Sequence, residues 1–218
     1  MVLGIDFSIK SPAICAKRSD GSLVFLAFPR KDVIKEDMEL LLRQHGVIVN
    51  RLDKELALPK TANLTFRERS SHDDAHVEIS AVMNELHKLD DAIESWAIEG
   101  FSFGSTGNRL AQISGYQWLL RHMITHDYLI SSAAMWVFAP MTVKATAGKG
   151  NFKKEDMITA FLASEDTSLR ETGLWIALTA DPASFQNKKG AWMKPIDDIV
   201  DAYWVLRTLE KHTVEIKN

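Results

Sequence analysis

The sequence predicts one α/β domain built around a mixed β-sheet. Three short apolar runs, VLGID, AICAKR and SLVFLAF, lie within the first 28 residues and are separated by turn-forming residues, a pattern typical of an antiparallel three-stranded meander. Two later apolar runs, SWAIEG and AMWVFAP, flank a stretch of helical periodicity, which predicts parallel strands joined by a crossover helix. With 218 residues, the chain is long enough for one full core, and we expect a single domain over 1–218.

The segments between these strands are expected to be helices and loops. Residues 30–73 have mixed polarity and predict an irregular insertion with one helix around DMELLLRQHG. Apolar residues recur at helical spacing over 75–93 and again over 107–126. The small residues Ala111, Ser114 and Gly115 would let the second of these helices pack closely.

The last third of the chain contains two predicted helices and a long connection. Asn151 is a good N-cap for a helix over 152–163, and Pro195 suits the first turn of a final helix over 196–212. Between them, residues 165–194 are expected to form a loop with one short apolar piece, GLWIALTA.

Composition argues against membrane and secreted classes of protein. Hydrophobic residues make up 46% of the chain and charged residues 25%, as in ordinary globular proteins, and no apolar run approaches the roughly 20 residues of a membrane helix. The first residues carry no signal-peptide pattern. The single cysteine, Cys15, lies in an apolar run, so we expect a buried structural thiol in a reducing compartment.

Charge is uneven along the chain. The net charge of -3 gives no general indication of nucleic-acid binding. Residues 141–154 nevertheless contain four lysines and no acid, and a second basic stretch precedes the last helix. The two stretches contain Lys144, Lys149, Lys153 and Lys154, and Lys188, Lys189 and Lys194.

Four carboxylates lie where chemistry is expected. Asp6 and Glu99 each end an apolar strand, and Asp198 and Asp201 lie three residues apart on one face of the last helix. A buried, unpaired carboxylate is costly, so these acids call for a cation. Together they could bind two Mg²⁺ or Mn²⁺ ions, a number that suits phosphodiester cleavage.

Four segments in order resemble those of RuvC-type Holliday junction resolvases, especially the divergent forms of bacteriophages. These segments are GIDFSIKSPAIC, AIEGFSFGSTGN, VKATAGKGNFKKEDMI and DDIVDAY. The resemblance extends over most of the chain except residues 30–70 and 165–190. It does not explain the insertion after the third strand or the long connection over residues 165–194.

The resemblance implies a ribonuclease H-like fold, a five-stranded mixed sheet flanked by helices, and a crossover junction endodeoxyribonuclease with two metal ions. Asp6, Glu99, Asp198 and Asp201 match the acids that bind the metals. The GKGN segment matches a DNA-associated basic stretch, which makes Lys144, Lys149, Lys153 and Lys154 candidates for phosphate contacts. The implied partner is branched DNA in a bacterial or phage-infected cytoplasm, with a homodimer that could form through helix 107–126.

Several alternatives remain for individual residues. Asp197 is also a neighbour of Asp201 on the helix, but an acid in a first turn is favoured by the helix dipole alone, and the family pattern selects Asp198. Two histidine pairs, His72 with His76 and His122 with His126, have a zinc-compatible spacing, yet no further ligand motif accompanies them. Trp192, Phe101 and Phe103 are candidates for stacking on or wedging into DNA.

Three other functions are compatible with parts of the pattern. The same acids could serve a nuclease for flaps, forks or hybrids, because they determine the chemistry and not the substrate. A DNA-binding or virion-associated protein could keep the fold without turnover. GID also begins actin-like and sugar-kinase chains, but the glycine-rich phosphate loops of those ATP-binding proteins are missing here.

Overall fold

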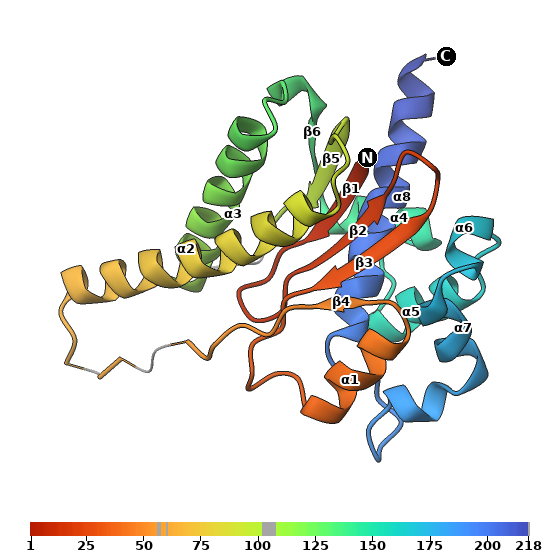
Figure 1. Ribbon diagram of the computed structural model, residues 1–218, viewed down its shortest axis with the longest axis horizontal. Coiled ribbons are helices and arrows are strands. Elements are labelled where there is room, and N and C mark those ends of the chain that lie inside the picture. Colours follow the sequence, from red (N-terminus) through yellow and green to blue (C-terminus); the bar gives the residue numbers. More distant parts are fainter. Residues whose placement is uncertain (56–57, 60, 102–107, 218) are drawn as a thin grey trace.

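A six-stranded mixed sheet forms the centre of the computed structural model, which describes residues 1–55, 58–59, 61–101 and 108–217 (Figure 1). The strand order is β4-β3-β2-β1-β5-β6. The strands are β1 (Val2–Asp6), β2 (Ala13–Lys17), β3 (Leu23–Ala27), β4 (Ile48–Val49), β5 (Ser95–Glu99) and β6 (Met135–Phe138). β1, β2 and β3 are antiparallel neighbours, whereas β5 is parallel to both β1 and β6.

This connectivity confirms the predicted meander followed by parallel strands, but the expected count of five strands is wrong. The sixth strand, β4, pairs in parallel with the end of β3 through Leu26 opposite Ile48. It lies inside residues 30–73, which the sequence predicts to be irregular. A strand of two residues is too short to show alternation, so only its pairing with β3 reveals it.

Helices cover both faces of the sheet (Figure 1). The longer ones are α1 (Glu36–Gln44), α2 (Leu64–Lys88), α3 (Asn108–Asp127), α4 (Pro140–Ala147), α5 (Lys154–Leu162) and α8 (Ile196–Lys217). One core cluster joins α2 and α3 to the face that carries Leu3, Ile5 and Ile98, and a second joins α1, α4, α5 and α8 to the face that carries Cys15 and Ala97. Cys15 is fully buried, as expected.

Two expectations for the last third of the chain differ from the structure. Residues 165–194, expected to form a loop, contain the helices α6 (Thr167–Arg170) and α7 (Gly173–Ala180) and a 3-10 helix, η2 (Pro182–Phe185). The apolar piece GLWIALTA shows no helical periodicity in the sequence, but it forms α7 and packs against the core. Asn151 does not cap α5. The backbone N–H of Lys153 instead bonds to the Asp156 carboxylate at 2.8 Å, which places the helix start two residues later.

α2 and α3 also depart from their sequence patterns. α2 begins at Leu64, well before the expected start near residue 75, because Asn63 caps it by accepting a hydrogen bond from the N–H of Phe66. On α3, Gly115 is exposed and a Cβ there would meet nothing within 4 Å, so this glycine supports no close packing. In the described part of the chain, none of the helices combines the length and apolar character needed to cross a bilayer.

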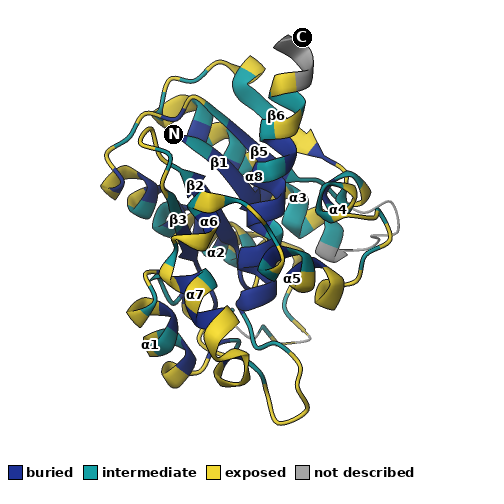
Figure 2. Cartoon of the chain, turned by 90° about the vertical axis from the view of Figure 1, so that its right-hand side faces the viewer, coloured by how far each residue is buried: buried dark blue, intermediate teal, exposed yellow. Residues whose placement is uncertain are grey.

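The closest packing in the fold joins α8 to β1. Burial is concentrated in the first two-thirds of α8 (Figure 2). A Cβ on Gly4 would overlap the backbone nitrogen of Leu206 and the carbonyl oxygen of Ala202, so only glycine permits this approach. Asp6 is two residues beyond Gly4, and the first turns of α8 therefore lie beside Asp6.

A buried ion pair fixes the loop that follows β1. Arg30 is 4% exposed and donates from Nε to the carbonyl of Ile9 at 2.9 Å, from Nη1 to that of Asp53 at 3.0 Å and from Nη2 to Oε2 of Glu78 at 2.9 Å. These bonds tie the loop after Asp6 to α2. Burial raises the pKa of Glu78 to about 8, although Arg30 lowers it.

Gly4→Ala should destabilise the protein by at least about 3 kcal/mol, because the new methyl group would overlap backbone atoms that only a shift of α8 could move. Gly115→Ala is the matched control and should stabilise α3 by up to about 1 kcal/mol. Urea unfolding of both variants measures the difference. Equal stability of the two would contradict the proposed contact.

Glu78→Gln should change how stability depends on pH. A native pKa of about 8 lies above the ordinary carboxyl value, so the native state holds a proton that the unfolded chain has released. The wild type must therefore lose stability as pH rises through this window. Relative to Glu78→Gln, we expect the wild type to lose about 3 kcal/mol between pH 5.5 and 8.5 in denaturant unfolding. A difference that does not vary with pH would show that Glu78 is ionised throughout.

Candidate active site

Three elements bring four acids to one edge of the sheet. β1 and β5 are parallel, with Ile5 opposite Ile98, so their carboxyl ends place Asp6 and Glu99 side by side. α8 contributes Asp198 and Asp201 from its first turns, which Gly4 allows to lie against β1. The structure therefore brings together the four acids that the sequence singles out.

Three of the four acids line one pocket of about 390 Å³. Asp6, Glu99 and Asp201 line it directly, together with Lys144 and Lys154. The other lining residues are Phe7, Ser8, Gly100, Phe101, Ile113, Gln117, Pro140 and Met157. Asp198 is not part of this lining and is only 3% exposed.

Burial raises the pKa values of all four acids, and neighbouring acids raise those of Asp6, Asp198 and Asp201 further. Burial raises the pKa of Asp6 well above its usual range, and the charges of Asp201, Asp198 and Glu99 raise it further. Burial and then Glu99 raise the pKa of Asp201 to about 7. Burial also raises the pKa values of Glu99 and Asp198. The cluster thus resists full ionisation unless a cation offsets its charge.

Two lysines supply part of that offset. Lys154 forms an ion pair with Asp197, and Lys194 forms ion pairs with Asp197 at 2.9 Å and with Asp198. Burial alone would raise the pKa of Asp197, but Lys194 and Lys154 hold it below its usual value. Asp197 therefore serves as the partner of both lysines and differs electrostatically from its neighbour Asp198.

The four lysines proposed for DNA contact do not lie together. Lys144 on α4 and Lys154 at the start of α5 reach the pocket. Lys149, in the turn after α4, and Lys153, before α5, are exposed and lie outside the pocket lining. Two of the four lysines thus line the pocket with the acids, and the other two are exposed outside its lining.

The donor set suits a divalent ion in ligand type. Carboxylate oxygens are the ligands that Mg²⁺ and Mn²⁺ prefer. Oδ1 of Asp197 and Oδ2 of Asp198 are buried and have no hydrogen-bond partner within the described part of the chain. Among the described residues, however, no three His, Cys, Asp or Glu side chains are already arranged to hold one ion. The acids thus fit a divalent ion chemically, provided that a side chain moves.

Gln117 is a site residue that the sequence does not reveal. It is 2% exposed, lines the pocket, and donates from Nε2 to the backbone carbonyl of Glu99 at 3.3 Å. Its Oε1 accepts a hydrogen bond from Arg121 at 3.0 Å. Neither charge nor spacing marks this glutamine, because its role depends on how α3 packs beside the end of β5.

The aromatic candidates have different positions. Phe101 lines the acid pocket. Trp192 packs against the core cluster of α8, which leaves less of its ring for stacking on a base. Phe103 falls outside the described residues. The histidines of both pairs, His72 with His76 and His122 with His126, are exposed on α2 and α3.

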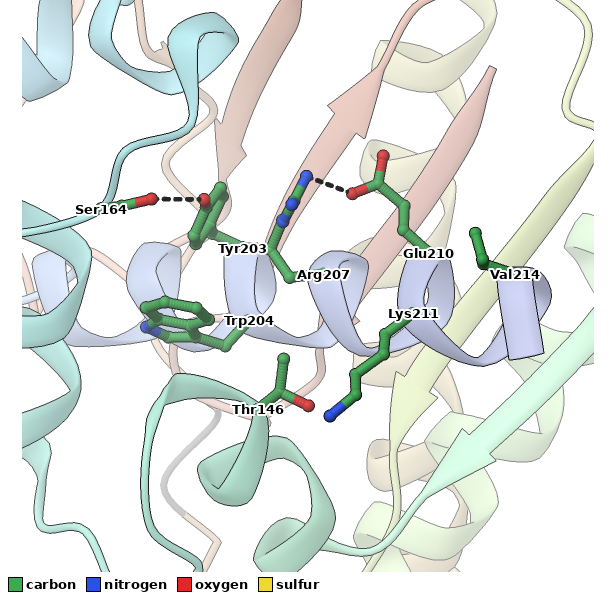
Figure 3. A pocket seen from close by; sticks show the side chains of 8 residues that line it. All are labelled: Thr146, Ser164, Tyr203, Trp204, Arg207, Glu210, Lys211 and Val214. Carbon is green, nitrogen blue, oxygen red and sulfur yellow. Dashed lines mark hydrogen bonds and ion pairs between the residues drawn. The ribbon is translucent and has the colours of Figure 1, made fainter.

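A larger pocket of about 600 Å³ lies along the C-terminal half of α8 (Figure 3). Its one acid, Glu210, is paired with Arg207 at 2.5 Å, and Tyr203 contacts Ser164 at 3.2 Å. The pocket thus lacks the cluster of acids seen at the sheet edge, and we place the candidate active site at the smaller pocket.

Among solved structures, the chain is similar to several of low sequence identity. No protein-family model and no curated protein sequence matches the chain. The chain is similar to RuvC of Thermus thermophilus, with 13% identity and a TM-score of 0.49 over 97% of this chain and 96% of that one. It is similar to T. thermophilus RuvC in complex with Holliday junction substrate, with 13% identity and a TM-score of 0.46 over 98% of this chain and 95% of that one. It is also similar to the yeast mitochondrial Holliday junction resolvase Ydc2, with 11% identity and a TM-score of 0.40 over 99% of this chain and 80% of that one.

Proposed function

We propose that this protein is a metal-dependent, structure-selective endodeoxyribonuclease that cleaves Holliday junctions or other branched DNA. The convergence of Asp6, Glu99, Asp198 and Asp201 from two strands and one helix is the observation that carries the proposal. Acids gathered in this way raise one another's pKa values at a cost in stability, which a metal-binding role would explain.

Asp6, Glu99, Asp198 and Asp201 would hold Mg²⁺ or Mn²⁺, with two ions per site as the working hypothesis. Divalent ions at such a site neutralise the phosphate and favour ionisation of the attacking water. Gln117 holds the backbone of Glu99 and so orients that acid toward the pocket. Lys144 and Lys154 line the same pocket, where their ammonium groups would bind nonbridging phosphate oxygens of the DNA strand.

The choice of branched DNA rests on the four RuvC-like sequence segments. Lys149 and Lys153 would contact the backbone away from the cut, because they are exposed beside the pocket. Resolving a four-way junction requires two opposed cuts, so we include a homodimer in the proposal. Such reactions belong in the cytoplasm of a bacterial cell or of a phage-infected host.

A nuclease for flaps, forks or hybrids would use the same acids, so labelled substrates of each kind must be compared with a four-way junction. Preference for the junction supports the proposal. Tight junction binding without cleavage at any Mg²⁺ or Mn²⁺ concentration would instead indicate a DNA-binding protein without turnover.

Asp6→Asn should reduce junction cleavage at least 1000-fold, roughly the loss expected when an essential catalytic group is removed. Cleavage of a labelled junction in Mg²⁺ and in Mn²⁺ measures the effect, and excess EDTA should abolish the wild-type activity. Asp20→Asn, in the exposed turn before β3, is the matched control and should cleave normally. Undiminished metal-dependent cleavage by Asp6→Asn would exclude this site.

Asp198→Asn and Asp197→Asn should differ in the same assay. Asp198 is the acid of the predicted metal set, whereas Asp197 is the common partner of Lys154 and Lys194. We expect a loss of at least about 100-fold for Asp198→Asn and less than about 10-fold for Asp197→Asn. The reverse order would assign the metal to Asp197.

A further inference from the structure

Lys194 belongs to a segment that the RuvC resemblance does not explain, yet its side chain ends at the acid site. Residues 186–192 form a short hairpin in which the N–H of Asn187 bonds to the carbonyl of Ala191 at 2.8 Å. Trp192 and Met193 then pack against the core. The next residue, Lys194, is thereby held immediately before α8, within reach of the acids in its first turn.

Lys194 is the cation that pairs with an acid of the proposed metal set. Its Nζ contacts Oδ1 of Asp198 and lies 2.9 Å from Oδ2 of Asp197. In the described residues, Asp6, Glu99 and Asp201 form no ion pair within 4.0 Å. One oxygen of Asp198 is therefore occupied by an ammonium group, and the other, Oδ2, is buried and has no hydrogen-bond partner among the residues that the structure describes.

The exposure of the two groups makes this pair exchangeable. The side chain of Asp198 is 4% exposed and fixed on α8, whereas that of Lys194 is 37% exposed. A lysine on a flexible stem can withdraw into water at little cost, and the buried carboxylate cannot. An incoming divalent ion would thus meet a carboxylate whose counter-ion is able to leave.

We propose that Lys194 is an exchangeable counter-ion that competes with the divalent ion for Asp198 and so sets the metal concentration at which the site is loaded. The inference rests on the proposed metal site. Lys194 neutralises Asp198 while the metal is absent, and metal binding displaces its ammonium group. This exchange would account for an acid cluster in which no three ligands are yet arranged around one ion.

The first test is Mn²⁺ binding without DNA, measured at constant pH by the loss of the free-ion electron paramagnetic resonance signal. Lys194→Gln should bind Mn²⁺ about tenfold more tightly than the wild type, equivalent to ~1.4 kcal/mol. Lys194→Arg keeps the charge and should bind within about threefold of the wild type. Lys17→Gln is the matched control: Lys17 pairs with another acid of α8, Glu210, at 2.7 Å, and its loss should leave Mn²⁺ binding unchanged.

Thermal melting separates competition from a structural role. In EDTA, Lys194→Gln should melt below the wild type, because Asp198 loses its counter-ion. Saturating Mn²⁺ should then raise its melting temperature by more than that of the wild type. A purely structural role for Lys194 would lower the melting temperature equally with and without Mn²⁺, and that result would overturn the inference.

A second measurement uses the wild type and does not depend on any variant folding. Amine labelling read by mass spectrometry should show Lys194 becoming several-fold more reactive when Mn²⁺ is added, with Lys17 as the unchanged internal reference. Constant reactivity of Lys194 while Mn²⁺ binds would refute the exchange. Absence of Mn²⁺ binding by both the wild type and Lys194→Gln would refute the proposed metal site as well, whereas binding by the variant alone would support the competition.

Discussion

The contact between Gly4 and the backbone of α8 is the constraint on which the candidate site depends. β1 ends in Asp6, and α8 begins beside it only because no side chain at Gly4 separates the helix from the strand. A larger residue would displace Ala202 and Leu206, and with them the two acids one turn earlier. A glycine that performs no chemistry thus determines where three carboxylates meet.

The lysines near this edge of the sheet neutralise only part of the negative charge of the acids. Five carboxylates, including Asp197, face the three lysines Lys144, Lys154 and Lys194. Among the described residues, the ion pairs at this site involve only Asp197 and Asp198. The remaining acids rely on protonation or on an added cation, which is reflected in the raised pKa values of Asp6 and Asp201. Such a surface is suited to a substrate that carries its own phosphate charges together with divalent ions.

The sequence predicts the parts of this structure that depend on local pattern. β1, β2, β3, β5 and β6 follow from apolar runs bounded by turn residues, and α8 from its periodicity and from Pro195. The sequence does not predict β4, because a strand of two residues shows no alternation of apolar and polar side chains. It does not predict α7 either, because the segment GLWIALTA has no polar face. The acids can be selected as candidates, but their convergence depends on the packing of α8 and the pairing of β1 with β5, which single residues do not encode.

Contacts across the fold explain the other omissions. Gln117 acquires a role only when α3 lies beside the end of β5. Lys194 and Asp198 are four residues apart, but Pro195 between them places the lysine outside the helix, so the usual pairing rule for helices does not identify them. Both residues are visible only once the elements are placed in space.

The distance along the chain between the acids has a consequence for biosynthesis. Asp6, Glu99 and Asp198 are separated by roughly a hundred residues at each step, so the ribosome finishes β1 and β5 long before α8 emerges. Until then the nascent sheet exposes the groove beside Gly4 and lacks half of the carboxylates. The nuclease chemistry proposed for this edge therefore requires α8, and truncated products that end before α8 would lack the proposed site.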